Sequence, residues 1–215
     1  MRRALPRFGP ILGLPRALPR FGPFARSSSI LLLTGCLAFG LASCGSSTPP
    51  GAAPSAWAAT FCGALESWTQ QVGTVTTSYS SQMTNNPDAT TVKNDTTAFL
   101  EHQAELIDTL IATVAKTGHP AVTNGAKVTQ ALLTAFNGYK NVVTQSQAQL
   151  TTISPSNTTV LYNALDSIGT KLDAADATLG KAVAAVGRKY STAADQALVS
   201  ALNSNKTCRK FATGS

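Results

Sequence analysis

The stretch from Leu161 to Val186 reads LYNALDSIGTKLDAADATLGKAVAAV, and it decides which kind of fold to expect. Its apolar residues recur at alternating intervals of four and three positions. An α-helix completes a turn every 3.6 residues, so this spacing places them all on one helical face. They are Leu161, Leu165, Ile168, Leu172, Ala175, Leu179, Ala182 and Val186. A face of this length must be buried against other helices.

Three earlier segments show the same spacing. The first contains Phe61, Leu65, Trp68, Val72, Val75 and Tyr79; the second contains Val92, Phe99, Leu106, Ile107, Leu110 and Val114; the third contains Leu132, Phe136, Tyr139, Val143, Leu150 and Ile153. Thr96 and Gln103 dilute the apolar face of the second segment. Trp68 lies on the face of the first and is expected in the core, whereas Trp57 could equally stack on a sugar or a lipid.

Turn-forming residues separate the four segments at Asn86-Pro87-Asp88, Gly118-His119-Pro120 and Ser154-Pro155-Ser156. Ser154 is a plausible N-cap, with Pro155 at the first helical position. Short connections make neighbouring helices antiparallel, so the sequence predicts an all-α, up-down-up-down four-helix bundle. A short fifth helix is expected after Gly187. Its apolar side would consist of Ala194, Ala197, Leu198, Ala201 and Leu202.

The N-terminus has the pattern of an export signal. Six of the 17 basic residues lie before residue 27, and none of the 10 acidic residues does. The apolar run from Ile30 to Ala42 is shorter than the roughly 20 residues that span a membrane. A basic segment followed by such a run is typical of a secretory signal. Residues 44–215 therefore carry 11 basic against 10 acidic residues, and the overall excess does not indicate a nucleic-acid partner.

The apolar run ends in Leu41-Ala42-Ser43-Cys44, which resembles the bacterial lipobox. That resemblance implies cleavage before Cys44 and a diacylglycerol on its thiol, with palmitate among the acyl groups of the anchor. A second match, Leu33-Thr34-Gly35-Cys36, is the alternative site. An uncleaved or non-lipidated secretory signal is also possible.

The chain thus divides into a lipoprotein signal peptide (1–43), a flexible tether (44–55) and a helical bundle domain (56–215). The expected location is the outer face of the plasma membrane, outside the cytoplasm and held by lipid.

Two cysteines remain after signal removal, Cys62 and Cys208. Outside the cytoplasm such a pair is most simply a disulfide. A redox role is less favoured, because the chain has no C-x-x-C motif. In the predicted topology the start of the first helix and the end of the fourth share one end of the bundle. The short fifth helix can then turn back, so that the two cysteines meet and staple the bundle.

Both ends of the domain carry a further resemblance. The lipobox, the tether, the stretch Trp57-Ala-Ala-Thr-Phe61-Cys62-Gly-Ala-Leu65-Glu-Ser-Trp68 and Ala201-Leu202 ahead of Cys208 resemble small secreted proteins and lipoproteins of actinobacteria. The resemblance implies a fold and a location, and it implies no particular activity.

The sequence offers no recognisable catalytic or metal-binding motif, so we expect no enzyme activity, no cofactor and no metal. Glu101, His102 and Glu105 raise the possibility of a di-iron site. Such a site needs two Glu-x-x-His motifs and further glutamates, and this chain has no Glu-x-x-His.

The leading functional prediction is a non-enzymatic interaction module of the cell envelope. Its partners would be the membrane, through the lipid anchor, and an unidentified envelope protein or lipid, but no nucleic acid. The alternative is a carrier of lipids or small molecules with a cavity between helices. Five glycines would mark either that cavity or close helix packing: Gly73, Gly125, Gly138, Gly169 and Gly180. An uncharacterised enzyme is the third possibility.

Basic residues gather near the C-terminus at Arg188, Lys189, Lys206, Arg209 and Lys210. The predicted topology places them at the same end as the tether, so they are expected to contact the membrane surface. An ordinary solvated tail is the alternative.

Overall fold

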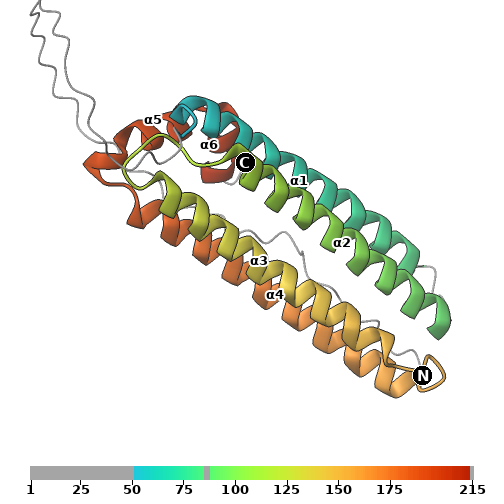
Figure 1. Cartoon of the computed structure of the whole chain (residues 1–215). Helices are drawn as coiled ribbons and strands as arrows, with labels where there is room; N and C mark the ends of the chain where they lie inside the picture. Colours follow the sequence, from blue (N-terminus) through green and yellow to red (C-terminus); the bar gives the residue numbers. More distant parts are fainter. Residues whose placement is uncertain (1–50, 85–87, 214–215) are drawn as a thin grey trace, which may run out of the picture.

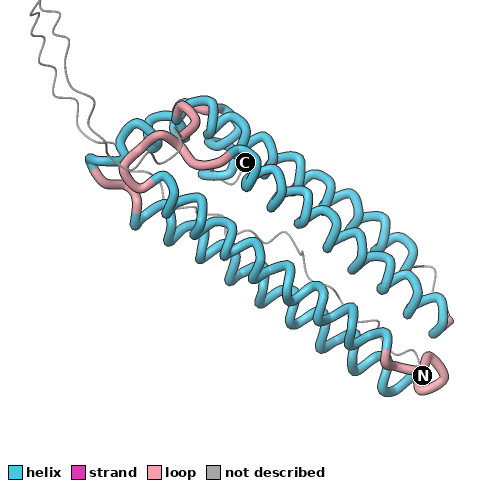
Figure 2. Tube along the Cα trace, viewed as in Figure 1, coloured by secondary structure: helices cyan, strands magenta, loops and turns pink. Residues whose placement is uncertain are grey.

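The computed structural model describes residues 51–84 and 88–213, and these residues form helices joined by short loops (Figures 1 and 2). Four long helices run alternately up and down: α1 (Pro54–Thr84), α2 (Ala89–Thr117), α3 (Gly125–Thr151) and α4 (Thr158–Lys189). Each packs along the next one in the chain. The predicted four-helix bundle is confirmed. The predicted signal peptide, Cys36, Cys44 and the predicted tether as far as residue 50 lie outside the described residues. The end of the predicted tether belongs to the domain instead, because Ala52 pairs with the α2–α3 loop and α1 begins at Pro54.

The apolar faces predicted from the sequence form the core. Trp68 is buried as expected, and Trp57 is buried as well, with 1% of its surface exposed. Thr96 and Gln103, which dilute the face of α2, are also buried. The Thr96 hydroxyl is satisfied by the Val92 carbonyl, at 2.7 Å, and by the Tyr79 hydroxyl, at 2.8 Å. A polar residue can therefore take an inward position of a helix without interrupting it.

The α3–α4 turn differs from the prediction. Ser154 does not cap α4, which begins three residues after Pro155. The Asn157 side chain caps it by accepting a hydrogen bond from the Val160 amide, at 3.2 Å. The hydroxyl groups of Ser154 and Ser156 are hydrogen-bonded to each other across the turn, at 2.8 Å, and Pro155 lies in the loop between them.

The C-terminal region contains two short helices instead of the one predicted. A 3₁₀ turn, η1 (Ala193–Asp195), leads into α5 (Gln196–Ser204), and α6 (Lys206–Thr213) follows. Asn205 separates the two helices, because its backbone is extended and its side chain accepts hydrogen bonds from the first turn of α6. The inward side of α5 consists of Leu198, Val199 and Leu202, whereas the predicted Ala194 and Ala197 are exposed.

The predicted disulfide between Cys62 and Cys208 is present, with the two Cα atoms 5.3 Å apart. It fastens α6 to α1 across a sequence separation of 146 residues. Within the described residues, the hydrophobic core lies between Ala52 and Cys208. A chain from Ser46 to Ser215 keeps this core and the disulfide, so we expect it to fold on its own.

Replacing Cys208 by serine should lower the free energy of unfolding by about 2 to 5 kcal/mol, because the unfolded chain loses a very long cross-linked loop. Thermal unfolding of Ser46–Ser215 measures this. Addition of a reductant should lower the melting temperature of the wild type and leave Cys208→Ser unchanged. Free thiols at both positions in oxidised protein, found by non-reducing mass mapping, would contradict the assignment.

Candidate functional site

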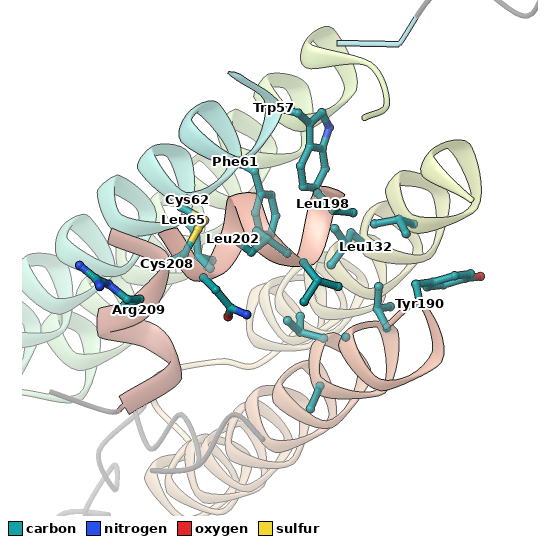
Figure 3. A pocket seen from close by; sticks show the side chains of 17 residues that line it. Trp57, Phe61, Cys62, Leu65, Leu132, Tyr190, Leu198, Leu202, Cys208 and Arg209 are labelled. Carbon is teal, nitrogen blue, oxygen red and sulfur yellow. A yellow bond between two sulfur atoms is a disulfide. The ribbon is translucent and has the colours of Figure 1, made fainter. Parts of the chain in front are cut away.

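An apolar pocket of about 120 Å³ lies at the disulfide end of the bundle (Figure 3). The start of α1, the start of α3 and the end of α4 meet there with α5 and α6. Among the described residues, α1 packs closely against α2, α5 and α6 but hardly approaches α4. The pocket occupies the space that α1 and α4 leave between them. Its wall includes Trp57, Phe61, Leu132, Val186, Leu198 and Leu202.

Trp57 is held firmly in this wall. Its indole nitrogen donates a hydrogen bond to the Gly118 carbonyl, at 3.0 Å, and its ring stacks on Phe61 with the centroids 5.0 Å apart. The same carbonyl accepts a bond from the Thr129 hydroxyl, at 3.2 Å. Gly118 ends α2 with a φ of +74°, a conformation that residues with a Cβ atom rarely adopt. One glycine thus joins the start of α1, the end of α2 and the start of α3.

Asp195 fixes the start of α5, which lies over the pocket. Its carboxylate is fully buried and accepts hydrogen bonds from the backbone and side-chain nitrogens of Asn124, at 3.0 and 2.9 Å, and from the Thr192 hydroxyl, at 2.9 Å. Burial opposes ionisation, but these bonds outweigh it and lower the pKa of the carboxyl group. Since the disulfide holds α6, α5 is tied down at both of its ends.

The chain also enters the domain here. Ala52 pairs with the α2–α3 loop: its amide donates to the His119 carbonyl and its carbonyl accepts from the Ala121 amide, both at 2.8 Å. The first described residues are therefore attached to the disulfide end before α1 begins.

The structure gathers the predicted site residues at this end. Cys62, Cys208 and Arg209 line the pocket, and Figure 3 shows the Arg209 guanidinium pointing away from the Trp57 side of it. Arg188 and Lys189 lie between two further wall residues, Gly187 and Tyr190.

The remaining contacts of the basic residues are local. The Lys189 ammonium lies over the Tyr190 ring, 5.5 Å from its centroid. Lys206 and Lys210 are exposed on α6, where Lys210 forms an ion pair with Glu66 at 3.1 Å.

Two more lysines join this basic group, and sequence reasoning missed both. Lys116 lies in the last turn of α2 and Lys127 in the first turn of α3, and both are exposed. Their addition depends on the antiparallel arrangement, which brings the end of α2 and the start of α3 beside the end of α4. In the described part of this end the acidic residues include Asp195, which is buried, and Glu66, which is paired with Lys210. We call Lys116, Lys127, Arg188, Lys189, Lys206, Arg209 and Lys210 the basic end.

The glycines suggested as cavity markers do not border this pocket. Gly125 marks close packing, because a Cβ atom there would collide with the carbonyl of Pro120. Gly138 lies in an outer groove of about 550 Å³ between α3 and α4, together with exposed residues such as Thr134 and Thr178. The pocket at the disulfide end is the more enclosed and the more apolar of the two sites.

The middle of the bundle contains buried polar groups. The side chain of Gln103 and the hydroxyl of Ser146 are buried without a hydrogen-bond partner. The ion pair of Asp108 with Lys140 and the hydrogen bond from Gln147 to Glu101 mark the register of α2 against α3. This register places Gln103 and Ser146 at the same level. A polar layer of this kind discourages shifted alignments of the helices.

Asp176 lies near this layer and is 5% exposed. Burial, aided by the negative charge of Asp173, raises the pKa of its carboxyl group to about 6. Its own charge adds to burial in raising the pKa of the Tyr139 hydroxyl. The folded state therefore holds the proton on Asp176 more tightly than the unfolded chain does.

The two histidines lie on different elements. His102 is exposed on α2, and His119 lies in the α2–α3 loop. Residues 51–84 and 88–213 contain no cluster of three or more histidine, cysteine, aspartate or glutamate side chains that could hold a metal. Within the same ranges, no helix has a stretch long and apolar enough to cross a membrane.

Comparison with known proteins adds no relative: no protein-family model, no curated protein and no solved structure matches the chain.

Replacing Asp195 by alanine should lower the free energy of unfolding by about 1 to 3 kcal/mol, because two partly buried donors of Asn124 lose their acceptor. The loss should be local to the pocket. Hydrogen exchange of Ser46–Ser215 should become faster in α5 and stay unchanged in the middle of α3. Asp166→Ala, at an exposed position of α4, is the matched control. Equal exchange in α5 of both variants would contradict this role of Asp195.

Asp176→Asn should raise stability at neutral pH. The pKa of Asp176 is higher in the folded protein than in the unfolded chain, so protonation of this carboxyl group favours the folded state. That stabilisation is complete below about pH 4 and is lost as the pH rises through about 6. The free energy of unfolding of the variant should exceed that of the wild type by about 1 to 3 kcal/mol at pH 7.5. This difference should shrink towards pH 4. Urea unfolding at several pH values measures it, with Asp166→Asn as control. A difference that does not change with pH would contradict the prediction.

Proposed function

We propose that this protein is a non-enzymatic, membrane-anchored module of the cell envelope, which stands outside the cytoplasm with its basic end against an anionic lipid surface. A lipid on Cys44 would hold it there. The observation that carries this proposal is the gathering of exposed basic side chains at the end where the chain enters the domain.

Charge favours this orientation. An anionic leaflet attracts a lysine or arginine near its surface by about 1 kcal/mol, and the attraction decays within a Debye length. The basic end carries seven such residues from α2, α3, α4 and α6. Glu66 neutralises part of the charge of Lys210. The remaining residues suffice for several kcal/mol of attraction at low ionic strength.

The proposed anchor would attach on the same side. Cys44 and Ala52 are eight positions apart in the sequence. A fully extended chain covers at most ~3.5 Å per residue, so those positions are separated by no more than about 28 Å. Because Ala52 is bonded to the α2–α3 loop, lipidation at Cys44 keeps the basic end close to the membrane. A lipid and a basic patch together bind membranes more stably than either alone.

A carrier of lipids or small molecules is the second candidate. The apolar pocket between α1 and α4 favours it, because a preformed apolar hollow is the usual place for a small hydrophobic ligand.

Flotation with liposomes tests the proposed orientation. Lipid-free Ser46–Ser215 should float with anionic vesicles at low salt, and much less with neutral vesicles or at high salt, because counterions screen the attraction. Changing all five C-terminal basic residues to glutamine should reduce recovery on anionic vesicles by about tenfold or more. Those residues are Arg188, Lys189, Lys206, Arg209 and Lys210.

A charge-matched pair of variants separates the basic end from net charge. One variant changes three residues of the basic end to glutamine, and the other changes three lysines of the opposite half. The first set is Arg188, Lys189 and Arg209; the second is Lys93, Lys140 and Lys171. Only the first should lose binding. Equal losses, or equal recovery on anionic and neutral vesicles, would refute the proposal.

A further inference from the structure

We propose that the pocket at the disulfide end binds the hydrocarbon chain of a single-chain anionic amphiphile, a fatty acid or a lysophospholipid, with its head group beside the basic end. This inference deepens the carrier function proposed above by naming the class of ligand. The pocket, its size, its surroundings and the helix over it carry the argument in turn.

The wall selects hydrocarbon. Aromatic and aliphatic side chains dominate it, contributed by α1, α3, α4 and α5. Several of them are only half-buried, including Leu65, Val183, Val199 and Leu202. A hydrocarbon chain between them would complete their burial, and each buried methylene group contributes about 0.8 kcal/mol. No helix of this bundle supplies that burial, because α1 and α4 hardly approach each other in the described residues.

The size selects a single chain. An apolar cavity of roughly 150 Å³ binds a molecule as large as benzene. The present pocket, of about 120 Å³, therefore takes the terminal carbons of one chain and excludes a pair of chains side by side. This distinguishes a fatty acid or lysolipid from an intact diacyl phospholipid.

The surroundings select a negative head group. Arg209 is a wall residue on the α6 side, and Arg188 and Lys189 follow the wall residue Gly187 in the sequence, with their side chains exposed. Of the acidic residues at this end in the described part of the chain, Asp195 is buried and hydrogen-bonded, and Glu66 is paired with Lys210. A head group that leaves the pocket on either side would thus lie near basic side chains.

The helix over the pocket forms one of its walls. α5 is held at its start by the Asp195 hydrogen bonds and, through α6, by the disulfide. Between these two points it presents Leu198, Val199 and Leu202 to the pocket. This apolar wall is therefore already in place before a ligand binds.

Tryptophan fluorescence tests the proposal directly. Trp57 lines the pocket, whereas Trp68 is buried against Tyr139 outside it, with ring centroids 5.9 Å apart. Bromine atoms quench tryptophan only at close range, so a fatty acid brominated near its methyl end should quench Trp57. In Ser46–Ser215, Trp68→Phe should keep this quenching and Trp57→Phe should lose it. Absence of saturable quenching, or equal quenching in both variants, would overturn the proposal.

A filled pocket provides the second test. Val199→Phe places a larger side chain in the wall, and Val142→Phe makes the same change at a half-buried valine of the outer groove. Only Val199→Phe should weaken binding of the brominated fatty acid, by about tenfold, the effect of withdrawing about two methylene groups from burial. Both variants retain Trp57, the fluorescent reporter. A difference in quenching between them therefore reflects a difference in ligand binding. Equal affinities would overturn the assignment of the pocket.

The head group is tested with three brominated ligands: a fatty acid, a lysophosphatidylglycerol and a zwitterionic lysophosphatidylcholine. The first two should bind more tightly than the third. Arg188→Gln with Arg209→Gln should abolish that preference, whereas Lys93→Gln with Lys171→Gln should keep it. A preference between the two anionic ligands identifies whether a fatty acid or a lysophospholipid supplies the hydrocarbon chain. Equal binding of all three by the wild type would refute the anionic head group.

These binding measurements use no membrane, so their outcome does not depend on the outcome of the flotation experiment. Quenching without preferential flotation on anionic vesicles would refute the proposed orientation and retain the pocket ligand. Charge-dependent flotation without quenching of Trp57 would retain the membrane-bound module and refute the ligand.

Discussion

The bond between Cys62 and Cys208 is the constraint on which the functional end of this protein depends. Besides this bond, α6 is joined to α1 by the ion pair of Lys210 with Glu66 and by a long hydrogen bond from Thr207 to the same carboxylate. Those contacts are partly exposed, and exposed ion pairs contribute little to stability. The disulfide keeps α6 on α1, and with the Asp195 hydrogen bonds it fixes the position of α5 over the pocket.

Two buried aspartates show how the surroundings of a carboxylate decide its role. Asp195 is buried with three donors and stays ionised, so it can hold the start of α5 against the α2–α3 loop. Asp176 is buried near another aspartate, and its pKa is raised. The first carboxylate fastens the structure at the pocket. The second, together with Gln103 and Ser146, places polar groups in the middle of the core, where they lower stability and favour a single helix alignment.

Net charge gives little indication of the surface that this domain presents. Its basic and acidic residues nearly balance, but the antiparallel arrangement separates them along the bundle. Lys116 and Lys127 come from two helices whose facing ends meet at the pocket, beside Arg188 and Lys189 of a third. Asp88 and Asp95 lie at the far end, where α2 begins. The entry of the chain at Ala52, the basic residues and the apolar pocket thus share one end, and the proposed membrane-bound role of that end draws on all three features together.

The sequence by itself determined the helices and their order, because the spacing of apolar residues in α1 to α4 allows one face of each helix to be buried and no other. It also predicted the cysteine pairing, since Cys62 and Cys208 are the two cysteines outside the predicted signal peptide and lipidation site. The cap of α4 by Asn157 and the break at Asn205 were not predictable, because short polar residues compete on nearly equal terms for such positions. Only the tertiary structure decided the pocket and the basic end. Both arise from how far α1 stands from α4 and from which helix ends meet, and those distances depend on side chains from all the packed helices at once.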